Sequence, residues 1–112
     1  MMSKYGSIKT VIDGITFDSK KEARRYAELK LLQRGKQISC LELQPRFKIV
    51  DGLKINGHKK MSDRYYIADF MYLDKDGNTI VEDVKGVKTA VYTLKKHLFL
   101  SLFGKTLTFR EI

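Results

Sequence analysis

An aspartate, Asp69, lies in the middle of the most apolar segment of the sequence, which runs from Tyr65 to Leu73. The aromatic and apolar side chains of this segment predict a buried β-strand. A carboxylate inside such a strand is costly unless a cation or hydrogen-bond donors compensate its charge. The chain must therefore fold so that a compensating group lies beside this strand.

A second acidic segment lies about ten residues further along the chain. Residues 79–85 predict a strand antiparallel to the first, and it contains Glu82, Asp83 and Lys85. Because side chains alternate between the faces of a strand, Asp83 and Lys85 share a face with Val81, whereas Glu82 points to the other face. The candidate functional pair is therefore Asp83 with Lys85.

The loop between the two strands decides whether Asp69 can meet this pair. A two-residue turn would place Asp69 opposite Val84, on the wrong face. A three-residue loop, Asp76–Asn78, would place Asp69 opposite Lys85 and diagonal to Asp83. The site thus requires a loop with an odd number of residues, or a bulge.

These residue types suit a divalent-metal site that hydrolyses phosphodiesters. Mg²⁺ prefers oxygen ligands and often takes one or two carboxylates together with substrate phosphate, so Asp69, Asp83 and the backbone carbonyl of Val84 are the predicted ligands. Lys85 would orient the attacking water or stabilise negative charge on the phosphate. The competing structural interpretation is that Asp83 and Lys85 form an exposed ion pair while Asp69 meets a buried donor.

Glu22 is a third candidate acid, with two interpretations. It lies three residues after Ser19 at the start of a predicted helix, which is the spacing of a capping box. The other interpretation is that Glu22 faces the sheet as an additional metal or water ligand. Position and spacing alone favour the cap.

The remaining pattern predicts an α/β (α+β) fold, a mixed sheet with helices packed on it, in a single domain over residues 1–112. Residues 38–44 are ambiguous, because Pro45 argues against a central strand there, and residues 54–62 are predicted to be a polar loop. Apolar residues at helical spacing, Ala23, Tyr26, Ala27 and Leu31 in the first helix and Val91, Leu94, Leu98 and Leu102 in the second, predict the apolar stripes of the helices. The predicted elements are a hairpin (10–12 and 15–17) turning at Asp13-Gly14, a helix (18–34), strands (47–50, 65–73 and 79–85), a helix (89–103) and a strand (106–110).

The charge favours a polyanionic partner. The 112 residues include 22 Lys and Arg against 13 Asp and Glu, a net charge of +9, which fits DNA or an anionic surface better than a neutral ligand. The alternative for any single lysine is a solvated surface position. The basic residues gather in three places: Lys20, Lys21, Arg24 and Arg25; His58, Lys59, Lys60 and Arg64; and Lys88, Lys95 and Lys96.

Location is constrained only weakly. Cys40 is the single cysteine, so no disulfide within the chain is expected. The sequence contains no apolar run of the roughly 20 residues that a membrane span needs. We expect no membrane partner and a cytoplasmic location.

Three segments together resemble a known family. Residues 11–23 (VIDGITFDSKKEA), 66–70 (YIADF) and 81–86 (VEDVKG) look like those of small phage and prophage proteins catalogued as a domain of unknown function, which is similar to the PD-(D/E)XK, or restriction-endonuclease-like, nucleases. The resemblance covers nearly the whole chain. It implies an αβββαβ core, which agrees with the predicted order of elements.

The resemblance also implies roles for individual residues. Asp69 would be the first acid, Asp83 the second and Lys85 the motif lysine, with Glu22 as the glutamate that many members carry on the first core helix. Ala68 departs from the motif, which has proline there, and the resemblance permits Glu82 as the second acid if the strand is distorted. The implied activity is that of a Mg²⁺-dependent (or Mn²⁺-dependent) DNA endonuclease of a bacterial host cell, acting on branched DNA as a homodimer. The alternative is a non-catalytic nucleic-acid-binding module on the same fold.

Overall fold

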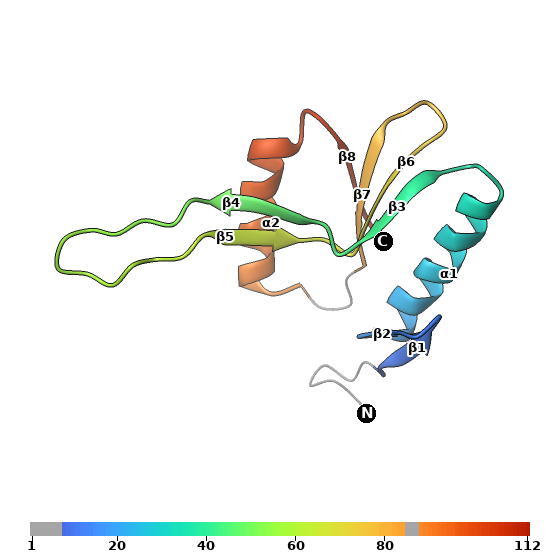
Figure 1. Cartoon of the computed structure of the whole chain (residues 1–112), viewed down its shortest axis with the longest axis horizontal. Coiled ribbons are helices and arrows are strands. Elements are labelled where there is room, and N and C mark those ends of the chain that lie inside the picture. Colours follow the sequence, from blue (N-terminus) through green and yellow to red (C-terminus); the bar gives the residue numbers. More distant parts are fainter. Residues whose placement is uncertain (1–7, 85–87) are drawn as a thin grey trace.

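The chain folds as a mixed α+β protein with an N-terminal hairpin, as predicted (Figure 1). The computed structural model describes residues 8–84 and 88–112, so the predicted motif residue Lys85 lies outside the described residues. The elements in chain order are β1 (Thr10–Ile12), β2 (Ile15–Phe17), α1 (Lys20–Arg34), β3 (Ser39–Leu43), β4 (Arg46–Val50), β5 (Arg64–Ile67), β6 (Phe70–Leu73), β7 (Thr79–Asp83), α2 (Ala90–Phe103) and β8 (Thr108–Glu111).

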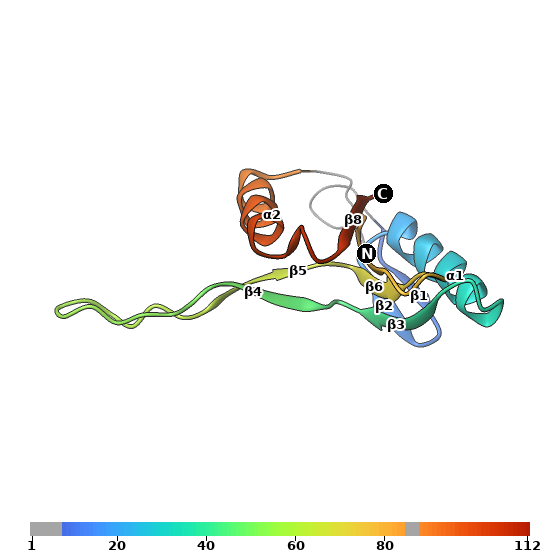
Figure 2. The ribbon, with the colours of Figure 1, turned by 90° about the horizontal axis from the view of Figure 1, so that it is seen from above.

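A four-stranded mixed sheet forms the centre, in the order β3-β6-β7-β8. Its first three strands pair antiparallel, whereas β7 and β8 pair parallel. Successive residues of β7 pack against different helices. Ile80 packs in one core with Leu29 of α1, and Val81 packs in another with Phe99 of α2. The two helices therefore cover opposite faces of the sheet, as the view from above shows (Figure 2).

A bend in a long hairpin distinguishes the structure from the prediction. The predicted strand 65–73 is two strands, because β5 pairs with β4 while β6 pairs with β3. At the bend the Ala68 N–H donates to the carbonyl of Pro45 (3.1 Å) and the Gln44 N–H donates to the carbonyl of Asp69 (3.0 Å). Pro45 has no N–H to continue the ladder, and Gln44 has a positive φ of 50°. These two residues turn the chain out of the sheet.

The ambiguous segment before Pro45 is the edge strand β3. The pairing of β3 with β6 shifts register between Ser39 and Glu42, and Cys40 within this bulge has a positive φ of 57°. Proline directly after an edge strand is compatible with a sheet, so the objection to a central strand was sound.

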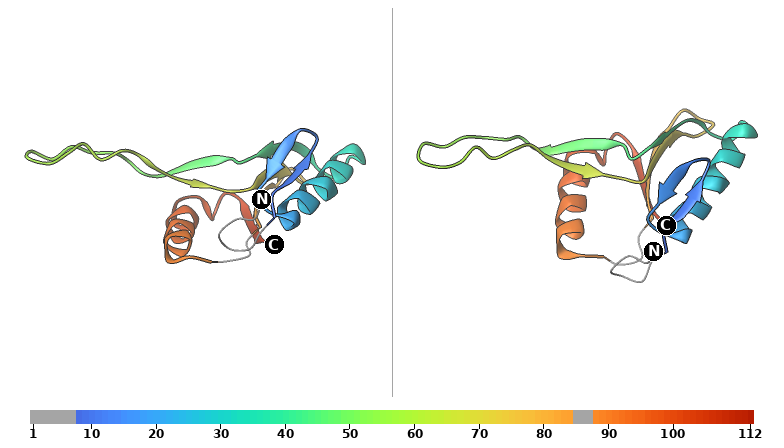
Figure 3. Two further views of the ribbon diagram at one scale, coloured as in Figure 1. Left: turned by 90° about the horizontal axis from the view of Figure 1, so that it is seen from below. Right: turned by 60° about the horizontal axis from the view of Figure 1, so that its bottom comes forward.

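Beyond the bend, β4 and β5 continue as a projecting two-stranded arm (Figures 1 and 3). Past the end of β4 the two segments of the arm are still paired by an antiparallel bridge between Leu53 and Met61. The radius of gyration is 16.2 Å, against about 13 Å for a compact chain of this length. The predicted polar loop 54–62 is thus the distal part of this arm.

The N-terminal hairpin and α1 were predicted with nearly correct bounds. Asp13 and Gly14 have φ values of 54° and 76°, as a type I′ turn requires. The Tyr26 hydroxyl donates to Asp13 Oδ2 (3.0 Å), which fastens the turn to α1. Ser19 is the N-cap of the helix: its Oγ accepts the N–H of Glu22 (3.1 Å). Of the predicted apolar stripe, Leu31 is exposed instead.

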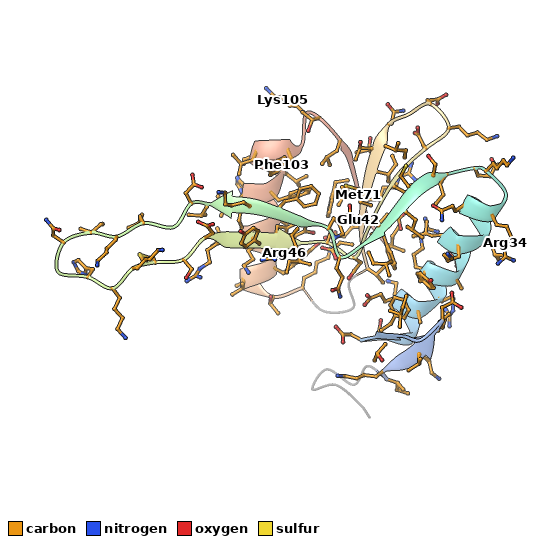
Figure 4. All side chains as sticks on the ribbon, in the orientation of Figure 1. Arg34, Glu42, Arg46, Met71, Phe103 and Lys105 are labelled. Atoms are coloured by element: carbon orange, nitrogen blue, oxygen red, sulfur yellow. The ribbon has the colours of Figure 1, made fainter. Side chains whose placement is uncertain are left out.

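Of the apolar stripe predicted for α2, only Leu98 packs against the core, and the other three residues do not. Val91 and Leu94 are each 62% exposed and Leu102 is 57% exposed. The helix instead turns aromatic side chains inward: the ring of Phe47 on β4 lies 4.7 Å from Phe99 and 5.3 Å from Phe103, and Figure 4 labels Phe103 among the side chains between α2 and the strands. Aromatic rings bury more area than the aliphatic residues of the stripe, so they determine which face is buried.

Candidate functional site

Asp69 lies at the bend, where the arm leaves the central sheet. Its N–H donates to the carbonyl of Glu82 (3.1 Å), and its Oδ2 accepts the N–H of Val84 (2.6 Å). The backbone of Asp69 is therefore bound to β7, and its carboxylate points to the end of that strand. The buried donor required by the sequence is this backbone N–H. The carbonyl of Val84 stays a predicted ligand.

The register of β6 and β7 brings Asp83 level with Asp69. Phe70 pairs with Glu82, so the next position of each strand places Asp69 and Asp83 side by side. The prediction of an odd loop is confirmed, but the loop has five residues, Asp74–Asn78, not three.

The side chain of Asp74 explains the longer loop. Asp74 Oδ1 accepts the N–H groups of Asp76 and Asn78, both at 2.9 Å. An aspartate that binds backbone groups two and four residues ahead stabilises a turn wider than a two- or three-residue hairpin. As a result Asp69 lies level with Asp83 rather than opposite Lys85.

Asp83 is fully buried, with an exposed fraction of 0%. The Tyr66 hydroxyl donates to Asp83 Oδ2, and burial together with Asp83 raises the pKa of the Tyr66 phenol. Tyr66 therefore stays a proton donor that orients the carboxylate. Sequence reasoning missed Tyr66; the signal was a tyrosine in a buried strand, three residues before Asp69, since a buried hydroxyl needs a partner.

The acids at this position repel each other. Burial is the largest cause that raises the pKa of Asp69 to about 8, followed by its side-chain hydrogen bond with Asp83 and by the charges of Glu22 and Asp83, against the opposing N–H of Val84. A carboxylate that holds its proton near neutral pH is one whose negative charge lacks sufficient compensation. A divalent cation would supply that compensation.

Glu82 faces the other side of the sheet and has its own cation. Arg25 on α1 binds it in bidentate fashion, with Nε to Oε1 at 2.7 Å and Nη2 to Oε2 at 2.6 Å. The Tyr72 hydroxyl donates to Oε2 as well. Glu82 is thus compensated within the α1 core, and Asp83 is the acid that lies beside Asp69. Arg25, expected among the surface cations, serves this internal pair.

Glu22 lies at the start of α1 and its charge reaches Asp69, so the cap and the site role both stay predictions for its side chain. The Ser19 half of the capping box is present, and the Glu22 side chain is buried with 9% exposed. Its charge also contributes to raising the pKa of Asp69. The first turn of α1 therefore brings a third carboxylate toward Asp69 and Asp83.

The predicted DNA-contacting residues occupy three surroundings. Lys20, Lys21 and Arg24 are exposed on the first turns of α1, beside Glu22, and Lys59 and Lys60 are exposed on the arm. Lys88 and Lys96 instead bind Glu111, at 2.9 Å and 3.1 Å, and Lys95 is half-buried on α2. Tyr92 donates to Glu111 too, and this bond, with Lys88, lowers the pKa of Glu111 to about 2.

The donor chemistry at Asp69 and Asp83 fits a hard divalent cation. Carboxylate oxygens are the ligands Mg²⁺ prefers, and two of them suffice when water and phosphate complete the shell. Within residues 8–84 and 88–112 no group of three His, Cys, Asp or Glu side chains is arranged to hold a metal ion by itself. Any cation here would therefore depend on water or a bound phosphate for its remaining ligands.

In the described part of the chain, neither helix has the length and apolar character needed to cross a membrane. No curated protein and no solved structure matches the chain. A family model matches residues 2–110, which include the bend, all three carboxylates and both helices. This chain therefore belongs to the family described as "Protein of unknown function (DUF1064)".

Proposed function

We propose that this protein is a metal-dependent DNA endonuclease that hydrolyses phosphodiester bonds. The observation that carries the proposal is the position of Asp69 and Asp83, level with each other on adjacent strands, with Asp83 fully buried. Burying one acid beside another is costly and has no benefit for folding alone. A cation between them would turn this cost into a binding site. The resemblance to restriction-endonuclease-like nucleases supports the same assignment.

In this mechanism Asp69 and Asp83 would hold Mg²⁺ or Mn²⁺, with the carbonyl of Val84 as the proposed third ligand. When bound, the ion acts as a Lewis acid on the scissile phosphate and lowers the pKa of an attacking water. The Tyr66 hydroxyl and the Val84 N–H fix the two carboxylates in place. Lys85 is the proposed cation that stabilises negative charge developing on the phosphate.

Glu22 is proposed to take part as a further acid that positions water. Its charge acts on Asp69 from the first turn of α1. Lys20, Lys21 and Arg24, exposed on the same two helical turns, would neutralise phosphates next to the scissile one. Lys95, Lys96 and Lys88 are proposed as secondary contacts, because two of them already bind Glu111.

The proposed setting comes from the resemblance. It is phage recombination or replication in the cytoplasm of a bacterial host, with branched or four-way-junction DNA as substrate and a homodimer as the active assembly. The exposed apolar residues of α2, Val91, Leu94 and Leu102, are a surface on which a second copy could pack.

Cleavage of labelled linear, nicked, flapped and four-way-junction DNA in Mg²⁺ or Mn²⁺ tests the proposal. We expect the wild type to cut, Asp69→Asn and Asp83→Asn to lose at least about 100-fold in activity while still folded, and Lys85→Ala to lose cleavage. A matched control is Asp76→Asn, an acid in the exposed β6–β7 turn. Cleavage retained by Asp69→Asn would exclude it from the site.

One observation favours a second candidate, a non-catalytic nucleic-acid-binding module. The carboxylates already have protein donors, since Val84 and Tyr66 bind one oxygen of Asp69 and Asp83 respectively. Such a module would bind DNA with steep salt dependence and never cut it. Binding of all four substrates without cleavage in either metal would favour this function over the nuclease.

A further inference from the structure

The distal part of the projecting arm, between the end of β4 and the start of β5, buries very little of itself. Every residue from Leu53 to Arg64 is exposed, and Leu53, Ile55 and Met61 are 45%, 58% and 56% exposed. An isolated two-stranded hairpin is marginal in water because ordering it costs entropy that no core repays. The stability of the folded chain therefore does not explain why the arm is present.

The arm is nevertheless a specified structure. Leu53 and Met61 exchange both backbone hydrogen bonds, at 2.9 Å and 2.7 Å. The Gly52 N–H donates to Asp63 Oδ1 at 2.7 Å. A Cβ on Gly52 would lie 2.5 Å from the carbonyl oxygen of Met61, so no larger residue fits without a shift of the backbone. These contacts hold the two segments of the arm together beyond the end of β4.

The charge of the arm selects a polyanion. Residues 46–67 include six Lys and Arg but only two acids, a net charge of +4. Both acids are used within the arm: Asp51 binds Lys48 (2.9 Å) and Asp63 accepts from Gly52. A second copy of this basic chain would meet repulsion at this surface, whereas phosphates would meet attraction.

The two faces of the arm differ. Phe47 and Tyr66 pair with each other and turn toward α2, in the second core cluster. On the other face Arg46 lies over the ring of Tyr65, 4.3 Å from its centroid. On this face Lys48 pairs with Tyr65, and Arg46 pairs with Ile67, which is 50% exposed. The outward face thus combines cations with aromatic and apolar side chains.

The dimensions suit a duplex. A two-stranded ribbon fits the major groove of duplex DNA, which is about 12 Å wide. The 12 residues from Arg46 to the tip at Gly57 are separated by steps of roughly 3.3 Å and span ~36 Å. One turn of duplex DNA is ~34–36 Å long. The base of the arm is the bend that holds Asp69.

We propose that the arm, residues 46–67, is a groove-binding ribbon that docks on double-stranded DNA about one helical turn from the Asp69–Asp83 site. This proposal rests on the proposed function for what the carboxylates do, and concerns binding alone. It defines the substrate as one with a duplex flank of at least about one turn next to the cleaved bond.

Fluorescence anisotropy with a duplex of about 30 base pairs, roughly three helical turns, in EDTA tests the arm without cleavage. The arm variant is Lys54→Gln/Lys59→Gln/Lys60→Gln. The matched control is Lys30→Gln/Lys75→Gln/Lys105→Gln, which removes the same charge from α1, the β6–β7 turn and the turn after α2, all away from the arm (Figure 4 labels Lys105). We expect the arm variant to bind at least about tenfold more weakly and to lower the slope of log Kd against log salt by about two to three. The control should keep the slope to within about one.

Equal losses in the two variants, or no loss in the arm variant, would overturn the proposal. So would equal affinity of the wild type for a single strand of the same length, because a single strand has no groove. Sedimentation of Leu53→Ser/Ile55→Ser separates the rival occupant: a wild-type dimer that this variant alone makes monomeric would assign the arm to a second copy. Binding that depends on the arm, without cleavage in Mg²⁺, would refute the proposed nuclease function but not the proposed DNA-binding role of the arm.

Discussion

At the scale of single residues, three acids lie on two faces of one sheet and differ in how they are compensated. Glu82 has the bidentate guanidinium of Arg25. Asp69 and Asp83 have a backbone N–H and a phenol. A neutral donor compensates a carboxylate less than a cation does, so the Asp69–Asp83 pair is the one that a metal would relieve.

The raised pKa of Asp69 predicts how stability depends on pH. Since its folded-state pKa is about 8, the folded chain keeps a proton that the unfolded chain loses above about pH 4. Its contribution to stability is complete below about pH 4 and falls as the pH rises to about 8. We expect the melting temperature in EDTA to fall across this window, and Asp69→Asn to remove most of that fall. Parallel wild-type and variant curves would show that Asp69 titrates normally.

Arg25 is predicted to be essential for stability. Its removal takes the bidentate partner from Glu82, which is buried at 0% exposure, and costs on the order of 3–5 kcal/mol. We expect Arg25→Met to lower the urea midpoint strongly, and Arg25→Met/Glu82→Gln to recover at least half of the loss, because the amide needs no counter-charge. Arg24→Met, an exposed neighbour, is the control. A single variant as stable as this control would disprove the internal role of Arg25.

At the scale of elements, the helix start at Ser19 links folding to the site. Ser19→Ala removes the cap on the Glu22 N–H and should cost about 1 kcal/mol, with cleavage unchanged. Glu22→Gln keeps a side chain that can serve a capping box but loses the charge that acts on Asp69. We expect Glu22→Gln to keep or raise the melting temperature and to lose cleavage. The reverse pattern, lower stability with full cleavage, would make Glu22 a cap alone.

The inward face of α2 predicts which of its residues matter. Phe99 is fully buried and stacks on Tyr66 at 4.6 Å, so Phe99→Ala should cost about 3–5 kcal/mol. Leu102→Ala, at a 57% exposed position, should cost less than about 1 kcal/mol. Chemical denaturation of both variants measures the difference. A larger loss from Leu102→Ala would restore the aliphatic stripe as the core face.

The elements also show how far a sequence can be read. The hairpin, both helices and the pairing of β6 with β7 follow from local signals: Asp13-Gly14, the Ser19 cap and alternating apolar residues. The face of α2 did not follow, because leucines and aromatics both repeat at helical spacing and only packing chooses between them. The register at Asp69 depended on Asp74, whose bonds to the loop are not visible in a pattern of apolar residues.

At the scale of the whole molecule, the site lies where a compact body meets an extended arm (Figure 3). A single apolar run from Tyr65 to Leu73 hides this division, because nothing in its composition marks the change of partner at Ala68 and Asp69. Pro45, between the two neighbouring strands, was the local sign of the bend. The acids could be found from the sequence, but their partners could not: only the fold shows that Tyr66 binds Asp83 and that Arg25 binds Glu82.

The central claim is that Asp69 and Asp83 form one site for a divalent cation, and a Mn²⁺ titration tests it without any substrate. Calorimetry at about pH 7 in buffers of different ionisation enthalpy should show one site, with release of close to one proton, because Asp69 must ionise to bind the metal. Asp69→Asn and Asp83→Asn should each lose the site, and Arg24→Met should keep it. The account would be contradicted if both aspartate variants bound Mn²⁺ as the wild type does. It would also be contradicted if the wild type bound no Mn²⁺ at a concentration about ten times a millimolar Kd.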